Sequence, residues 1–267
     1  MSTIYWSQTA NRKAFVSAVL EAVKPQMFGA EAFLVKPNLV SSEPCPTTTH
    51  PETLQAVLEF LSGKDVVVAD APAIDAGSAQ KIIASSPLRS VCEAFGVPLL
   101  NLYKSQDAQF ASPRGYSFAM FALPLQKDFV ISLPVLKSHN VCGMTGALKN
   151  QFGYLPRRER IAMHMGIKDI HKGIAELAVA AKPHWFIVDA VQISVCAQEM
   201  RHGGEVEDLG YIFAGSDPVS LDCFGLQLLQ KVAPGLQHKS PQDIPYLKYA
   251  LEYGVGSTQY QTVEITL

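Results

Sequence analysis

The chain has 267 residues, of which 48% are hydrophobic and 17% charged, so it can bury a substantial core and does not belong to the disordered class. Its net charge of −2 gives no basic excess for binding nucleic acid. No apolar run approaches the roughly 18 residues of a membrane span, and the first residues lack the charged and then apolar layout of a signal peptide. We therefore expect a cytoplasmic protein that binds neither nucleic acid nor membranes.

Short apolar runs, each followed by polar or turn residues, recur along the chain. They predict strands at 32–38, 65–70, 97–101, 128–134, 184–190 and 211–217. Most of these runs are rich in Val, Ile, Leu and Phe and do not alternate with polar residues. That pattern is typical of strands covered on both faces, as in a parallel α/β sheet.

Apolar residues at helical spacing predict helices between these strands. One helix is expected over 51–61, beginning at a proline that suits the first helical position. Two more are expected over 170–181 and 218–228. Because strands and helices alternate, we predict a doubly wound α/β fold, a mostly parallel sheet with helices on both faces.

The domain organisation follows from the absence of repeats and obvious linkers. Residues 1–267 are expected to form a single α/β domain. Within it, the stretches 102–125 and 141–172 are expected to be excursions or a small inserted subdomain.

Polar side chains follow five of the predicted strands. In such sheets, ligands bind at the carboxyl ends of the strands, where helix N-termini point their free N–H groups. The residues at these positions are Lys36, Asn38, Asp70, Asp75, Lys137, His139, Asp189, Ser216 and Asp217. We therefore predict a ligand site at this edge of the sheet.

Several of these residues also have a purely structural interpretation. Asn38 could shape the turn that follows it, and Asp217 could cap the helix that begins with the next residue. Asp70 and Asp189 could each hold a ligand hydroxyl, orient a lysine or cap a turn. Lys36 ends a buried strand, where lysine is rare without a partner, so we favour contact with an anion.

The segment 133–153 is the richest in candidate site residues. Its glycines let backbone N–H groups approach a ligand closely, and Lys137 and Lys149 would supply positive charge to an anion. Asn150 follows directly. Lys137 and His139 would face the same side of an extended segment, and His139 is suited to move a proton near neutral pH.

Thr48, Thr49 and His50 precede the predicted helix at 51–61. Their hydroxyls and imidazole could form an anion cradle at the start of that helix, or they could only cap it. The basic "RRER" run at 157–160 is interpreted as a solvated surface.

Neither the cysteines nor a histidine pair predicts a metal site. Cysteines occur at 45, 92, 142, 196 and 223 without C-x-x-C spacing, so we expect no iron–sulfur cluster, zinc ribbon or disulfide. His164 and His171 are two helical turns apart, but Gly166 would interrupt a helix between them. We predict no metal ligands.

Several ordered segments resemble the domain of unknown function 362 family. They are "VKPNLV", "TTTHPE", "LPVLKSHNVCGMTGALKNQFGYLP", "KPHWFIVDA" and "LGYIFAGSDPVSLD", which together extend over about residues 32–228. The resemblance implies an α/β protein whose lysines, histidine and aspartates line one site. The chain lacks the ferredoxin-like module with paired cysteines that many relatives carry, and the segment after the "IVDA" strand is longer and more charged. More distantly, the family is similar to nickel-pincer lactate racemases, which by fold analogy implies hydroxy-acid or carboxylate substrates.

The leading hypothesis is an enzyme that acts on a small anionic metabolite, a carboxylate or a phosphate ester. Lys137 and Lys149 would hold the anion, His139 would be the acid or base, and Lys36 would neutralise developing charge. The reaction would be either a redox step with an external donor or an isomerisation by proton transfer.

The alternative hypothesis is a non-catalytic binding or carrier protein for a cofactor or a metal-bearing group. His50, His139 and Cys142 would then be the ligands. The sequence defines no particular cofactor, and it leaves both a monomer and a homodimer open.

Overall fold

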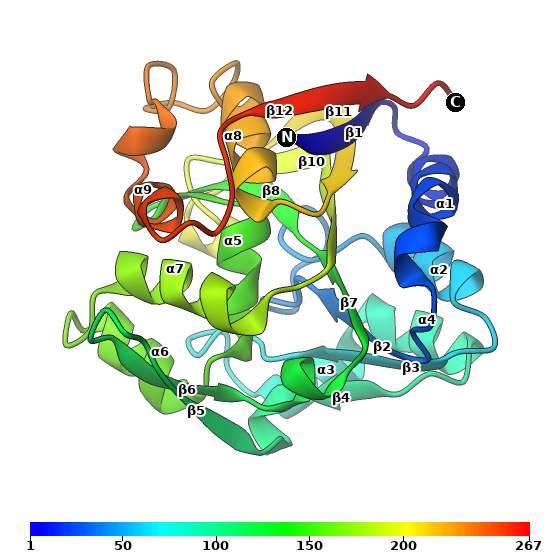
Figure 1. Ribbon diagram of the computed structural model, residues 1–267, viewed down its shortest axis with the longest axis horizontal. Coiled ribbons are helices and arrows are strands. Elements are labelled where there is room, and N and C mark those ends of the chain that lie inside the picture. Colours follow the sequence, from blue (N-terminus) through cyan, green and yellow to red (C-terminus); the bar gives the residue numbers. More distant parts are fainter.

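A mixed, mostly parallel sheet runs through the middle of the protein (Figure 1). The computed structural model describes residues 1–267. Eight strands follow one another in the order β12-β1-β11-β10-β7-β2-β3-β4. Their bounds are β1 Ser2–Gln8, β2 Ala32–Pro37, β3 Asp65–Asp70, β4 Leu99–Asn101, β7 Phe129–Leu133, β10 Trp185–Val195, β11 Glu205–Gly215 and β12 Tyr260–Glu264.

The central part of the sheet is parallel. β10 pairs with β7, β7 with β2, β2 with β3 and β3 with β4, all in parallel register. These five strands and β11 correspond to the six predicted apolar runs. The carboxyl ends of the parallel strands therefore lie at one edge of the sheet, which is where ligands bind in doubly wound folds.

The other part of the sheet was not predicted. β11 is antiparallel to both β10 and β1, and β12 pairs in parallel with β1 at the outside of the sheet. β1 and β12 were not predicted from the sequence, because neither is a continuous apolar run. β1 buries only every third residue, Ile4 and Ser7, and β12 has no buried residue.

Helices cover both faces of the sheet, as predicted (Figure 1). α1 Arg12–Val23, α2 Pro51–Phe60 and α4 Pro87–Ala94 pack one hydrophobic cluster against one face. α5 Ala147–Asn150, α7 Ile170–Ala181, α8 Pro218–Leu229 and α9 Pro245–Glu252 pack a larger cluster against the other. The remaining helices are α3 Ala79–Ser85 and α6 Arg157–His164. None of the helices is long and apolar enough to cross a membrane.

Two stretches depart from the alternation of strand and helix. Within 102–125, β5 Asp107–Ala111 and β6 Ser117–Phe121 form a separate antiparallel pair. The second stretch, 141–172, begins with β9 Gly143–Thr145, which turns back along β8 Val135–His139. β8 itself precedes this stretch and runs parallel to β10. This short detour brings the glycine-rich segment to the carboxyl ends of β2 and β3.

Candidate functional site

A cavity of about 310 Å³ lies at the carboxyl ends of β2, β3 and β8. Eight of the residues predicted from the sequence line it: Lys36, Asn38, Asp70, Asp75, Lys137, His139, Lys149 and Asn150. The prediction that Lys36, Lys137, His139 and Lys149 share one pocket is confirmed. The structure brings them together because β2, β3 and β8 all end at the same edge and α5 begins just beyond it.

Lys36 and Asp70 form a buried ion pair at the base of the cavity. Lys36 Nζ donates to Asp70 Oδ1 at 2.8 Å and to the carbonyl oxygen of Pro37 at 2.9 Å. The side chains are 1% and 4% exposed. Asp70 also accepts from the backbone N–H of Leu39 and Ala71. Burial lowers the pKa of Lys36 and Asp70 opposes this effect, so its charge is already matched within the protein.

Lys137 has no such counter-ion. It is 1% exposed, and its Nζ donates only to the carbonyl oxygen of Thr47, at 2.6 Å. Burial lowers its pKa to about 8, although the negative charge of Glu199 acts in the opposite direction. Lys137 is therefore mostly protonated at neutral pH and can release its proton at little cost.

Lys149 also lies in the cavity without a carboxylate partner. Its Nζ lies 4.0 Å from the centre of the Phe152 ring, a cation–π contact. Burial is the main cause that lowers the pKa of Lys149, and Arg160 and Lys36 add to it. Two lysines that lack a carboxylate partner thus face the same cavity, which favours an anionic ligand.

His139 is held as a neutral hydrogen-bond donor. Its Nδ1 accepts from the backbone N–H groups of Val141 at 3.1 Å and Cys142 at 3.2 Å, so the ring proton lies on Nε2. Burial, followed by the charges of Lys149 and Lys137, lowers the pKa of His139 to about 2. The expectation that His139 changes protonation near neutral pH is therefore wrong for the ligand-free cavity, because two cations and burial oppose a third charge there.

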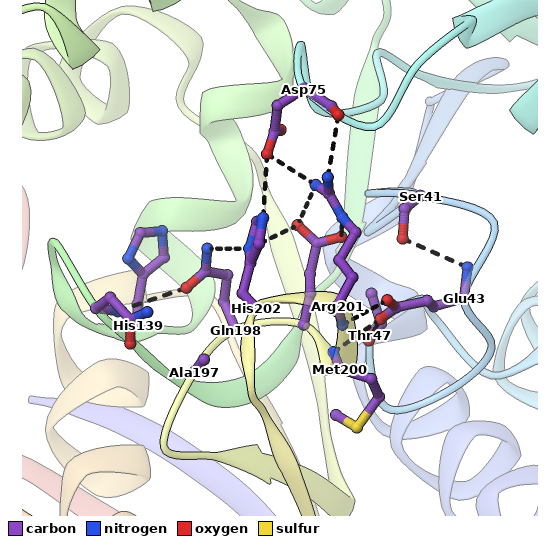
Figure 2. Close-up of polar contacts among 12 residues, drawn as sticks. Ser41, Glu43, Thr47, Asp75, His139, Ala197, Gln198, Met200, Arg201 and His202 are labelled. Carbon is purple, nitrogen blue, oxygen red and sulfur yellow. Dashed lines mark hydrogen bonds and ion pairs between the residues drawn. The ribbon is translucent and has the colours of Figure 1, made fainter.

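A loop from Cys196 to Gly203 covers part of the cavity (Figure 2). Arg201 donates two hydrogen bonds to the carboxylate of Glu199 and two to Asp75, one to its carboxylate and one to its carbonyl oxygen. Glu43 accepts the backbone N–H groups of Met200 and Arg201, both at 2.9 Å. These contacts fix Glu199, 2% exposed, beside Lys137.

Arg160 was interpreted as part of a solvated surface, and that interpretation is wrong. Arg160 lines the cavity, is 4% exposed and donates to four carbonyl oxygens, those of Leu155, Ala71, Pro72 and Gly153. Arg157 and Arg158 on the same helix are exposed as expected. The four carbonyl groups come from loops, so no local sequence pattern indicated that this one arginine is buried.

Thr48, Thr49 and His50 do not line the cavity, and the anion cradle expected from them is not formed there. Thr49 Oγ1 accepts from the N–H of Asn38 and donates to the carbonyl oxygen of Leu133, both at 2.7 Å. His50 is the N-cap of α2 and accepts from the N–H of Glu52. His50 thus caps the helix, which was the structural alternative, whereas Thr49 ties the turn after β2 to Leu133 of β7.

Asp189 and Asp217 also lie outside the cavity. Asp189 accepts from Arg12 Nε at 2.7 Å, and both side chains are buried. Asp217 caps α8 by accepting from the N–H groups of Val219 and Ser220. Because β11 is antiparallel, its carboxyl end points away from the cavity, which the prediction of a parallel strand did not anticipate.

The ligand set of the carrier hypothesis is not assembled. Of its three residues only His139 lines the cavity, and no group of three His, Cys, Asp or Glu side chains lies close enough to hold a metal ion. His139 Nε2 carries the ring proton, so it has no free lone pair for a metal such as nickel. The donor set of this cavity does not fit a metal ion.

A doubly wound α/β protein with a cationic cavity at the strand ends is the class that the fold and the site define. The sequence pattern of the family described as "Domain of unknown function (DUF362)" matches residues 33–227. The chain belongs to this family, as its ordered segments indicated.

Two comparisons extend this assignment. The thylakoid-associated protein sll1697 of Synechocystis sp. is 29% identical over 222 residues, which cover 78% of this chain and 64% of that protein. The chain thus spans less than two thirds of that relative. The lactate racemase apoprotein of Thermoanaerobacterium thermosaccharolyticum superposes with a TM-score of 0.59 and 13% identity, over 87% of this chain and 58% of that one. At this identity the likeness concerns the fold alone.

Proposed function

We propose that the protein is an enzyme that binds a small carboxylate or phosphate ester and moves a proton on it. Lys137 and Lys149 hold the anion, and His139 donates a hydrogen bond from Nε2. Lys36 lines the same cavity, but Asp70 matches its charge, so Lys137 and Lys149 are the cations available to the anion.

The single observation that carries this proposal is that Lys137 and Lys149 face one cavity without a carboxylate hydrogen-bonded to either. Glu199 lies near Lys137 but forms no hydrogen bond with it. A buried cation without a hydrogen-bonded counter-ion is costly, and a bound anion reduces that cost. The lactate racemase-like fold is consistent with a small-metabolite enzyme. The identity of the substrate and the class of reaction are part of the proposal.

Proton transfer suits the side chains of the cavity. A carbon acid next to a carboxylate loses its proton only if the electron pair left on carbon is stabilised. Lys149 and the Nε2–H of His139 supply that stabilisation. Lys137, with a pKa of about 8, can give a proton at neutral pH. The same anion site would serve a redox reaction with an external donor, but the proton transfer needs only groups that this chain supplies.

The test has a binding arm and a reaction arm. Sulfate, phosphate or malonate at constant ionic strength should raise the melting temperature. Ligand at a hundredfold excess over Kd stabilises the folded state by about 2.7 kcal/mol. In D₂O, the enzyme should exchange the proton next to the carboxylate in at least one of lactate, malate, glycerate and 2-phosphoglycerate, as followed by NMR.

Lys149→Met is the site variant and Arg157→Gln is its matched control, because Arg157 is an exposed basic residue outside the cavity. Lys149→Met should lose most of the anion-dependent gain, and Arg157→Gln should keep it. The opposite pattern would move the anion site to the outer basic face and end the proposal.

A further inference from the structure

Three histidines line the cavity: His139, His164 and His202. A neutral imidazole has one N–H donor and one nitrogen with a free lone pair, and its partners decide which nitrogen is which. A nitrogen with a free lone pair can take up a proton from a ligand. The hydrogen bonds of each ring therefore show which histidine has such a nitrogen available.

His139 and His202 both carry their proton on Nε2. In His139 this follows from the two backbone N–H groups that donate to Nδ1. In His202, Gln198 Nε2 lies 2.9 Å from Nδ1 and can only donate to it (Figure 2). Gln198 Oε1 accepts from the N–H of Asn140 at 3.5 Å, which fixes the orientation of that amide. His202 Nε2 lies 3.2 Å from Asp75 Oδ2, so its proton faces that carboxylate.

His164 has the opposite proton arrangement. Its Nδ1 lies 2.9 Å from the carbonyl oxygen of Arg160, and a carbonyl only accepts, so Nδ1 carries the proton. Nε2 is left with a free lone pair and no hydrogen-bond partner within the chain. Partial loss of contact with water lowers the pKa of His164 below its usual value, although the hydrogen bond to the carbonyl of Arg160 opposes this effect.

The position of His164 complements that of Lys137. Lys137 is fully buried deep in the cavity, whereas His164 is exposed at its mouth. The His164 ring packs against Phe152, with 5.6 Å between ring centres, and the same Phe152 ring contacts Lys149 Nζ. A ligand held by Lys149 therefore lies near a proton acceptor at the mouth and a proton donor at the base.

We propose that His164 Nε2 is the proton acceptor of this cavity, the role that the sequence gave to His139. The inference rests on the proposed function. The C–H bond next to the carboxylate breaks, its proton goes to His164 Nε2, and its electron pair is delocalised into the carboxylate, which Lys149 and the Nε2–H of His139 stabilise. An N–H bond of the Lys137 ammonium then breaks and returns a proton to the carbon, so that no oxidant or reductant is needed.

His164 could instead serve only to close the last turn of α6, through its Nδ1–H bond to the carbonyl of Arg160. Two substitutions separate these roles. His164→Asn places an amide N–H near the position of Nδ1 and so keeps that bond, but it has no Nε2. His164→Gln places a non-basic amide near the position of Nε2.

The first measurement is the ¹⁵N NMR spectrum of the histidine rings at neutral pH, compared between wild type and His164→Asn. One ring should have its proton on Nδ1, and its signals should vanish in the variant. A His164 ring with its proton on Nε2 would overturn the proposal whether or not a substrate is found.

The second measurement is deuterium exchange into the same four carboxylates. General acid–base catalysis typically contributes 10²–10⁴-fold, so His164→Asn and His164→Gln should lose at least about 100-fold. Both should keep the gain in melting temperature that sulfate gives the wild type. His238→Asn, a histidine outside the cavity, should exchange at the wild-type rate.

The outcomes distinguish the two proposals. If the wild type exchanges and His164→Asn does so at the same rate and with the same pH profile, His164 only closes α6 and the inference is wrong. If the wild type exchanges the proton next to the carboxylate in none of the four compounds, the proposed function is wrong, and the catalytic role of His164, which rests on it, is wrong as well.

Discussion

Removing the carboxylate of Asp70 should reveal how much the buried pair with Lys36 contributes to stability. Asp70→Asn leaves the Lys36 ammonium buried with one carbonyl as its remaining partner. The new amide group must also point its N–H₂ at one of the three donors that now approach the carboxylate. Breaking a buried ion pair in this way costs about 3–5 kcal/mol, a large part of the roughly 5–15 kcal/mol of a typical domain.

The measurement is urea unfolding, with the free energy extrapolated from the midpoint and slope. Glu59→Gln is the matched control, since it breaks the pair with Lys13, whose side chain is 55% exposed. That variant should lose less than about 1 kcal/mol.

A double variant guards against a single variant that fails to fold. Lys36→Met with Asp70→Asn removes both charges and should be more stable than Asp70→Asn alone, because no cation is left buried. The prediction is wrong if Asp70→Asn lowers the free energy of unfolding no more than Glu59→Gln does. It is also wrong if the effects of Lys36→Met and Asp70→Asn on that free energy are additive, because a buried ion pair couples its two partners.

Three further predictions concern the same end of the sheet. Gly153→Ala should cost at least about 3 kcal/mol in urea unfolding, because a Cβ there would lie 2.6 Å from Lys36 Nζ and closer still to Asp70; a variant as stable as wild type would contradict this packing. Burial raises the pKa of Asp222 to about 7, so the folded state holds a proton that the unfolded state has lost between about pH 4 and 7. Stability due to Asp222 should therefore fall as the pH rises through that range, by up to about 4 kcal/mol, and Asp222→Asn should gain stability relative to wild type between pH 5 and 7.5; a constant difference between the two proteins would refute it. The gain in melting temperature with sulfate should decline as the pH rises above about 8, where Lys137 loses its charge, and the decline should be smaller in Lys137→Met, where Lys149 alone remains to lose its charge.

The parallel part of the fold could be predicted because a strand buried on both faces is a continuous run of apolar residues in the sequence. Runs such as 65–70 and 128–134 are mostly apolar, with aspartates only at their ends, and each contains a strand of the central sheet. The edge strand β12 is not a continuous apolar run, because its residues face solvent. Its position in the sheet depends only on its pairing with β1. The sequence of one strand does not indicate which distant strand it pairs with.

The candidate site could also be predicted only in part. Lys36, Lys137 and Lys149 were found because a lysine in an apolar or glycine-rich segment is conspicuous. Arg160 and His164 were not, because α6 looks like an ordinary charged helix and only its packing against loop carbonyls distinguishes its two sides. Asp189 was misassigned because its partner, Arg12, is 177 residues away in the sequence.

The pairing of β1 also bears on how the chain reaches its native state. Ser7 of β1 lies opposite Ile212 of β11, so the first strand cannot be paired until about 200 further residues exist. At a synthesis rate of roughly 5–20 residues per second, that delay is about 10–40 s. During it, α1 can already pack on α2, whereas β1 waits with unpaired backbone groups. Folding of this chain on the ribosome should therefore finish with the pairing of β1, first to β11 and then to β12, and a nascent-chain binding factor that shields extended segments would act mainly on β1.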